Sequence, residues 1–360
     1  MELELSDEQR ALREAARAFL EREAPVSYAR EMMDDPRGWR DDVWRKMAAL
    51  GWMGLPFPED AGGVGMGFSA LAILLTEMGR VVLPGPYFST VVLAGHAVLE
   101  AGSEEQRKEL LPAIASGEIT WAAALSDTGV EARPDGDAFV LNGEARYVLD
   151  GATADRIVVE AGGELFVPDG AGLSATPVEL MDSTRRVAHV RFDGARAERL
   201  GDGDHGALDR VLDRAYVGLS AEMLGGAERV VELSVEYAKQ RVQFDRPIGS
   251  FQAVKHRAAD MLLDVESLRN AVSFAAWAIE RGHPDASIAS SMAKAYASDA
   301  YRRVASSGIQ VHGGIGFTWE HDMHLYFKRA KASEAAFGSA DWHRERLARL
   351  LETRYGSGGH

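Results

Sequence analysis

Cysteine is absent from the 360-residue sequence. A disulfide framework, a cysteine-ligated metal and a thiol nucleophile are therefore excluded. The absence fits a reducing compartment, and we expect a cytoplasmic protein. The acidic segment at residues 1–7 has neither the basic region nor the apolar region of a signal peptide. No apolar run reaches the roughly 18 residues that a membrane-spanning helix needs, so we expect no membrane span.

Positive charge is scarce in this chain. Lysine and arginine total 40 against 55 acidic residues, which gives a formal net charge of −15. Because nucleic-acid binding needs a basic surface, we predict no nucleic-acid partner. The composition, 46% hydrophobic and 26% charged, is typical of a globular protein with an acidic surface. The length is sufficient for two or three domains with cores of their own, and we predict no metal site.

The hydrophobic pattern divides the chain into three parts. Residues 1–116 carry apolar side chains at helical spacing, and Ser6 is a good N-cap for the first helix. Residues 117–203 contain short apolar runs between turn residues, and the pair Asn142-Gly143 predicts a β-hairpin turn. Residues 204–360 return to long helical stripes with few helix breakers. We therefore predict an α+β fold with an N-terminal α-helical domain, a middle antiparallel β-domain and a C-terminal four-helix bundle.

The segment at residues 241–252 follows the longest predicted helix and combines arginine, glutamine and phenylalanine. The guanidinium of Arg241 can bind a pyrophosphate with two hydrogen bonds. The rings of Phe244 and Phe251 can pack on other flat rings. A loop between helices that carries a surface arginine is the alternative interpretation, because a short motif is only a hypothesis.

A second segment, residues 310–318, begins at the predicted end of a helix and contains Gly313 and Gly314. Glycines at this place allow a positive φ and the close approach of a backbone or a phosphate. A plain helix C-cap is the alternative interpretation. His312 lies beside glycines and not beside other ligand-type residues, so we expect it to pack and not to transfer protons.

In this order, the two segments resemble the flavin-contacting segments of the acyl-CoA dehydrogenase family. Residues 55–65 and 77–80 resemble that family's proline–acid–glycine turn and the helix end that follows it, and the three-part order matches the family over the whole chain. The resemblance implies FAD as cofactor, an acyl-CoA as substrate and an electron-transferring flavoprotein as acceptor. It also implies that the FAD of a neighbouring subunit is contacted by Arg241, Gln243, Phe244, Ile248, Phe251, Gln310, Gly313 and Gly314.

The chain's own flavin site, which the family builds in the β-domain, is weakened relative to the family pattern. Ser126 matches a hydroxyl at the end of the first strand, but the Gly-Ser-Asp loop that follows in the family is missing. A tryptophan and a threonine of the family fall on Tyr147 and Leu149. Tyr147 keeps an aromatic face, whereas Leu149 lacks the hydroxyl that can hydrogen-bond a flavin.

The catalytic carboxylate of the family is also missing. The family's chemistry removes the proton alpha to the thioester, and a positioned base must accept that proton. A gapless count from the second segment places Phe337 at the usual glutamate, and the alternative base position on the long helix falls on Ala215. Asp213 and Glu334 lie near these positions in the sequence. A solvated or salt-bridged surface acid is the simpler interpretation of both, so we assign no base.

These patterns favour a subunit that serves a neighbour's flavin but lacks its own base. The leading hypothesis is one subunit of a heteromeric α2β2 acyl-CoA dehydrogenase, with a second acyl-CoA dehydrogenase chain as the source of the carboxylate. The run Tyr326–Lys331 adds a resemblance to actinobacterial enzymes of this kind that act on steroid side-chain CoA thioesters, which implies a bulky substrate. A self-sufficient homotetramer that uses Asp213 or Glu334 is the second hypothesis. A structural subunit without flavin is the third.

Overall fold

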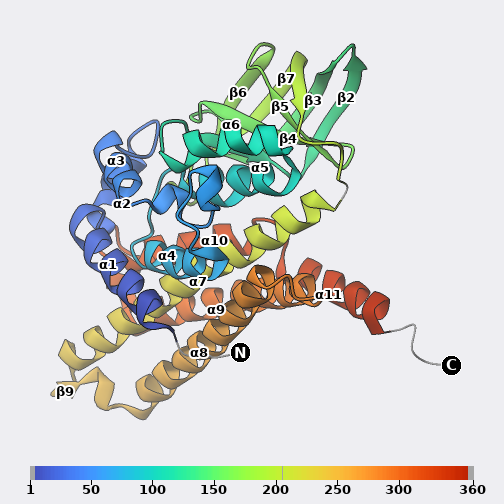
Figure 1. The fold of residues 1–360 in the computed structure, drawn as a ribbon. Coiled ribbons are helices and arrows are strands. Elements are labelled where there is room, and N and C mark those ends of the chain that lie inside the picture. Colours follow the sequence, from blue (N-terminus) through green and yellow to red (C-terminus); the bar gives the residue numbers. More distant parts are fainter. Residues whose placement is uncertain (1–4, 205, 356–360) are drawn as a thin grey trace. The chain divides into compact units, whose positions relative to one another are not determined.

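The computed structural model describes residues 5–204 and 206–355 (Figure 1). Most of the predicted acidic segment at the start of the chain lies outside these residues. Contacts divide the chain into two compact units that interleave in sequence. The helical unit comprises the residues up to 27, residues 68–83 and the residues from 216 onward, and the sheet unit comprises residues 28–67 and 84–215. The three sequence domains with limits at residues 116 and 203 stay a prediction.

Long helices make up the helical unit. They are α1 (Asp7–Glu23), α4 (Gly67–Arg80), most of α7 (Ala207–Gln240), α8 (Gln252–Glu280), α9 (Ala286–His312), α10 (Met323–Ala335) and α11 (Ala340–Tyr355). Helix α9 packs against α8, α10 and α11 (Figure 1). A short hairpin of β8 (Val242–Gln243) and β9 (Arg246–Pro247) and the 3-10 turn η4 (Ile248–Ser250) join α7 to α8, and η5 (Gly313–Phe317) follows α9. None of the described helices is long and apolar enough to cross a membrane.

The first helix begins at the predicted cap. The Ser6 hydroxyl accepts a hydrogen bond from the Gln9 backbone N–H, and the Gln9 side chain accepts one from the Ser6 N–H. This capping box satisfies two amides that have no partner inside the helix. Asp7 and Glu8 add negative charge in the first turn, where the helix dipole favours it.

Helices α4 and α7 cross at very short range inside the helical unit. A side chain at Gly79 would overlap the carbonyl oxygen of Glu222, so only glycine fits there. Beside this crossing, the buried Arg80 donates to Glu228 at 3.1 Å and to Glu232 at 2.7 Å, both on α7. Burial of such a cation requires paired carboxylates, and these bonds therefore fix the orientation of the two helices.

The sheet unit combines short helices with one curled sheet. Its helical segments are α2 (Val26–Met33), α3 (Asp41–Ala49), η1 (Trp52–Gly54), η2 (Glu59–Ala61), the π-helical η3 (Phe88–Gly95), α5 (His96–Ala101) and α6 (Glu104–Ala115). Its strands are β1 (Trp121–Ala124), β2 (Thr128–Asp135), β3 (Ala138–Leu149), β4 (Arg156–Ala161), β5 (Glu164–Pro168), β6 (Leu173–Val178) and β7 (Val187–Arg199). The strand order is β1-β4-β5-β7-β3-β2, and β6 also pairs with β7. The fold class is the predicted one.

Two local predictions within the sheet are wrong. Strands β1 and β4 pair in parallel, which is possible because β2 and β3 form a long connection between them. The predicted hairpin turn at Asn142-Gly143 lies inside β3, at a register shift against β7, and the turn between β2 and β3 is instead at Gly136. Gly143 is needed there because a side chain would overlap the carbonyl oxygen of Gly129 on β2.

Candidate functional site

Backbone conformation marks the segments that the sequence analysis selected. Seven non-glycine residues among those described have a positive φ, a conformation that costs about 1–3 kcal/mol and that often marks functional sites. Six of the seven lie in the segments predicted to contact flavin, immediately after one of them, or at the predicted base position. They are Asp127, Tyr147, Asp150, Phe244, Asp245 and Phe337.

The β8–β9 hairpin carries the predicted residues of the 241–252 segment at the surface. Phe244 and Asp245 have φ values of 53° and 57° at its tip, where a two-residue turn of this kind normally contains Asn or Gly. Phe244 is 85% exposed, and its ring contacts the edge of Phe251 at 6.0 Å. The guanidinium of Arg246 lies 4.1 Å from the centre of the Phe251 ring. A strained hairpin that exposes an aromatic ring fits a surface that receives a ligand or a partner.

The polar residues of this segment leave hydrogen-bonding capacity unused. The Arg241 guanidinium is exposed and forms no hydrogen bond or ion pair within the described residues. Gln243 donates only to the neighbouring carbonyl oxygen of Val242, at 2.9 Å. Ile248 lies half-buried in η4, and its N–H donates to the carbonyl oxygen of Arg241 at 2.8 Å. The guanidinium of Arg241 and the side-chain amide of Gln243 are donors of the kind that binds the pyrophosphate of FAD, which accepts hydrogen bonds from charged or amide groups.

The structure brings the 310–318 segment to the same region of the helical unit. His312, at the end of α9, stacks on Tyr237 near the end of α7 with ring centres 4.5 Å apart. The Tyr237 carbonyl oxygen accepts the N–H of Arg241 at 2.8 Å, which joins the two segments. Burial lowers the pKa of His312, whose Nδ1 donates to the carbonyl oxygen of Gly308. His312 therefore packs, as we expected.

Gln310 and the two glycines that follow His312 lie open on the surface. Gln310 is exposed and makes no side-chain hydrogen bond within the described residues. Gly313 has a φ of 63° and ends α9, which accounts for the glycine by the C-cap interpretation. A side chain at Gly313 or Gly314 would meet no atom within 4 Å, so the space beside them is free for a ligand or a neighbouring chain.

The predicted flavin residues of the sheet unit gather at one end of the sheet. Ser126 is exposed after β1, and Tyr147 is 61% exposed at an irregularity of β3. The N–H of Arg146 donates to the carbonyl oxygen of Asp127 at 3.2 Å, which places both segments side by side. The predicted residues at this end offer the hydroxyls of Ser126 and Tyr147 and one aromatic ring, and the side chain of Leu149 offers no donor. The residues present therefore fit a flavin only in part.

Two polar groups near Tyr147 were missed by the sequence analysis. The His189 ring contacts Tyr147 edge-on at 5.1 Å, and its Nδ1 is buried without a hydrogen-bond partner in the described residues. Asp150 is buried next to Leu149 and accepts a hydrogen bond from Ser89 Oγ at 2.6 Å. Burial raises the pKa of Asp150 to about 6. No local motif distinguishes either residue, because both depend on pairing between distant segments.

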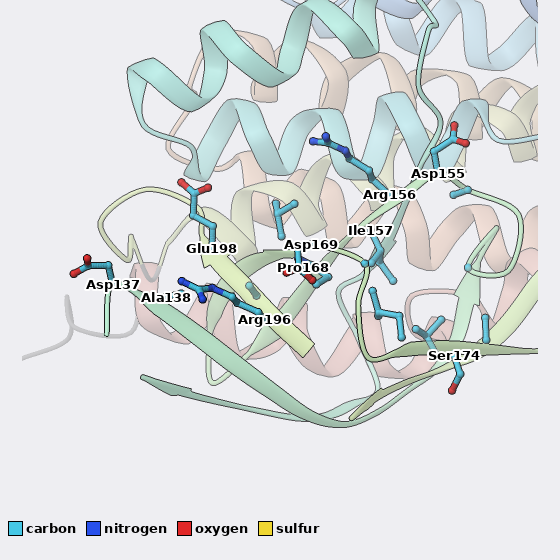
Figure 2. Close-up of a pocket in the computed structure, with 18 residues that line it drawn as sticks. Asp137, Ala138, Asp155, Arg156, Ile157, Pro168, Asp169, Ser174, Arg196 and Glu198 are labelled. Atoms are coloured by element: carbon cyan, nitrogen blue, oxygen red, sulfur yellow. The ribbon is translucent and has the colours of Figure 1, made fainter. Parts of the chain in front are cut away.

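A cavity of about 840 Å³ opens elsewhere in the sheet unit (Figure 2). Buried core side chains such as Ile157 and Val190 form part of its wall. Asp155 and Arg156 lie at one end, and Asp137 and Arg196 lie toward the other (Figure 2). None of the predicted site residues lines it. It is therefore distinct from the surface that carries Ser126 and Tyr147.

The residue after Ala215 and the backbone of Phe337 contact the same buried histidine, His343. Ala215 is buried on α7, and the next residue, Tyr216, packs edge-on against His343 of α11 with ring centres 4.6 Å apart. His343 Nε2 donates to the carbonyl oxygen of Phe337 at 3.0 Å. No acid stands at Ala215, Tyr216 or Phe337, so neither position can supply a proton acceptor.

The two weak candidates for a base differ in their surroundings. Glu334 on α10 pairs with Lys331 at 2.5 Å and with Arg302 at 3.3 Å, so the salt-bridged interpretation accounts for it. Asp213 is only 4% exposed on α7, so it is not a solvated surface acid, and the salt-bridged interpretation stays a prediction for this residue. Within the described residues, no group of His, Asp and Glu side chains has the arrangement of a metal site.

Comparison with known proteins identifies similar chains over almost the whole length. Models of the N-terminal and C-terminal domains of acyl-CoA dehydrogenases match residues 6–118 and 201–352. The chain is similar to acyl-CoA dehydrogenase IpdE2 of Mycobacterium tuberculosis, with 37% identity over 345 residues that cover 96% of each protein.

Solved structures give the same result. A variant of the Tcur3481-Tcur3483 steroid ACAD has a TM-score of 0.91 and 32% identity, over 98% of this chain and 99% of that one. The ChsE4-ChsE5 complex from Mycobacterium tuberculosis contains a chain with a TM-score of 0.89 and 29% identity, over 99% of both chains.

Proposed function

Because the chain belongs to the acyl-CoA dehydrogenase family, we propose that it is one subunit of a heteromeric, FAD-dependent acyl-CoA dehydrogenase. A second acyl-CoA dehydrogenase chain supplies the catalytic carboxylate. The main support is that Phe337 and Ala215 replace an acid at both base positions, whereas the surface segments around Arg241 and Gln310 keep their unpaired donors.

The reaction is the α,β-dehydrogenation of an acyl-CoA thioester. A carboxylate removes the α-proton, and FAD, when bound, accepts the hydride from the β-carbon. In this chain, Arg241 and Gln310 would hold polar groups of the cofactor that the neighbouring subunit binds, and the exposed ring of Phe244 would pack against its flat rings. These residues hold and orient the cofactor. They do not take part in proton transfer, because none of them carries a carboxylate or an imidazole that could accept the proton.

We propose a bulky acyl group, such as a steroid side chain, as the substrate. Support comes from the likeness to a steroid ACAD. The likeness to a complex named for two chains, ChsE4 and ChsE5, supports a partner subunit. An electron-transferring flavoprotein is the acceptor that the family predicts.

The first test is the ratio of flavin to protein, measured from visible absorbance on the purified chain and on the chain co-expressed with its partner. The proposal predicts little flavin in the isolated chain and about one flavin per pair of unlike chains. A full complement of flavin in the isolated chain, with full dehydrogenase activity, would contradict it.

A self-sufficient enzyme with a displaced base is the second candidate function, favoured by the buried carboxyl of Asp213. Substitution Asp213→Asn in an active isolated chain would then abolish turnover while flavin is retained. Glu345→Gln, at an exposed acid on α11, is the matched control. A structural subunit without flavin is the third possibility, and a colourless complex with the partner would favour it.

A further inference from the structure

Lys294 is a buried lysine that forms no ion pair within the residues that the structure describes. The lysine is fully buried. Its Nζ donates to Ser298 Oγ at 2.9 Å and to the carbonyl oxygens of Gly338 and Glu334 at 3.1 Å and 3.5 Å. All three acceptors are neutral. Burial of an ammonium among neutral groups is costly. Packing alone therefore does not account for a lysine at position 294.

The acceptors of Lys294 belong to one short turn between α10 and α11. The Glu334 carbonyl lies in the last turn of α10, where carbonyl groups lack partners inside the helix. A cation at a helix C-terminus is also favoured by the helix dipole. Lys294, which lies on α9, therefore caps the C-terminus of α10 through the Glu334 carbonyl oxygen. The same ammonium also binds the backbone of the turn at Gly338.

His343, which follows the turn in the sequence, also binds the backbone of this turn. This side chain comes from α11, is fully buried, and donates from Nε2 to the carbonyl oxygen of Phe337 at 3.0 Å. Burial lowers the pKa of His343 to about 3, so the ring is neutral and has a single N–H to donate. Tyr216 packs against the ring and holds its orientation.

The backbone that these two side chains hold is strained. Phe337 has a φ of 56°, which is unfavourable for a bulky aromatic residue, and Gly338 has a φ of 100°. A Cβ atom at position 338 would lie 2.7 Å from the Trp342 ring, so glycine is the residue that fits at this position of the turn. Without external hydrogen bonds, such a turn would relax to a common conformation.

We propose that Lys294 and His343 are positioning residues, which hold the turn at residues 336–338 so that the side chain at position 337 has one fixed orientation. The inference rests on the proposed function, in which position 337 lacks the base of this subunit. In this proposal, the subunit lacks the carboxylate at position 337, whereas the turn at residues 336–338 that would orient this carboxylate is still held in place.

The absence of cysteine makes position 337 directly testable. Phe337→Cys introduces a single thiol, whose rate of reaction with the disulfide reagent DTNB reports how firmly the turn is held. Adding Lys294→Met should raise this rate about tenfold, because the turn then opens locally. A thiol at the exposed Ser339, introduced by Ser339→Cys, should react at the same rate with and without Lys294→Met.

Equal rates for Phe337→Cys with and without Lys294→Met would overturn the proposal. A second pair of variants covers the case in which Lys294→Met does not fold. His343→Ala should raise the Phe337→Cys rate, whereas His343→Gln, which keeps an N–H donor, should restore the slow rate. Failure of that rescue would assign His343 a packing role only. Activity of the unmodified isolated chain would contradict the proposed function without changing the thiol result.

Discussion

At the level of single residues, two buried ionisable side chains contribute with opposite signs to the dependence of stability on pH. Asp150 is buried in the sheet unit, and burial raises its pKa to about 6, although the Ser89 hydroxyl and two arginines oppose this shift. The folded protein therefore binds a proton at Asp150 more readily than the unfolded chain does. This group favours folding below its ordinary pKa, and the contribution is lost as the pH rises through about 6.

Asp150→Asn should therefore stabilise the protein at neutral and alkaline pH. The amide oxygen can still accept the Ser89 hydroxyl, but no charge has to be buried. At pH 8 we expect an increase of about 2–3 kcal/mol in the free energy of unfolding, and little change near pH 4. Denaturant unfolding at both pH values measures this. Asp137→Asn, at an exposed acid, is the control, and a loss of stability at pH 8 for Asp150→Asn would refute the prediction.

The contribution of Lys294 to stability changes with pH in the opposite direction. Burial lowers its pKa to about 7, so the unfolded chain binds the proton more strongly between pH 7 and the ordinary lysine pKa. Stability should consequently rise with pH in this range, by as much as about 1.4 kcal/mol per pH unit from this group. In Lys294→Met the rise between pH 7 and 9 should be absent, although the variant is less stable overall. Equal pH dependence in both proteins would show that Lys294 is not the group responsible.

At the level of elements, the β8–β9 hairpin combines strain with exposure. Phe244→Gly removes an exposed ring and places glycine where φ is positive, so we expect an increase of about 1 kcal/mol in stability. The same change should lower the flavin content of the complex with its partner, because the ring no longer packs on the cofactor. Thermal unfolding and visible absorbance measure the two effects. Retention of all flavin by Phe244→Gly would remove this hairpin from the cofactor site.

The turn at residues 336–338 allows a gain of function. Phe337→Glu should give the isolated chain, with FAD in excess, dehydrogenase activity toward the bulky acyl-CoA substrate of the complex that exceeds the unmodified chain about a hundredfold, the usual contribution of a positioned base. Phe337→Gln has the same shape without a base and should stay inactive. A dye that accepts electrons from the flavin provides the assay. Equal activities of the two variants would show that position 337 does not face the thioester.

The elements also show which features a sequence can reveal. The cap at Ser6 depends on residues within one helical turn, and it was predicted. The pair Asn142-Gly143 has the composition of a turn, but tertiary pairing with β7 places it inside a strand. The meeting of Tyr216 and Phe337 at His343 depends on the packing of α7, α10 and α11. No local pattern encodes such a contact, so the sequence alone did not predict it.

At the level of the whole molecule, we propose that flavin contact and proton transfer belong to different subunits. The surface segments at residues 241–252 and 310–318 meet in the helical unit, and within the described part of the chain the exposed side chains of Arg241 and Gln310 have no hydrogen-bond partner. The base positions are filled by Ala215 and Phe337. The family order of these segments was predictable from the sequence because each motif is local. The assembly itself was not predictable, because a missing side chain does not reveal which chain replaces it.

We propose that this subunit depends on a partner for its proton acceptor. The most direct measurement is the dehydrogenase activity of the isolated chain, supplied with FAD, compared with the same chain co-purified with a second acyl-CoA dehydrogenase chain that carries the glutamate. Our account predicts no activity for the isolated chain and activity for the complex. Activity of the isolated chain equal to that of the complex would contradict it.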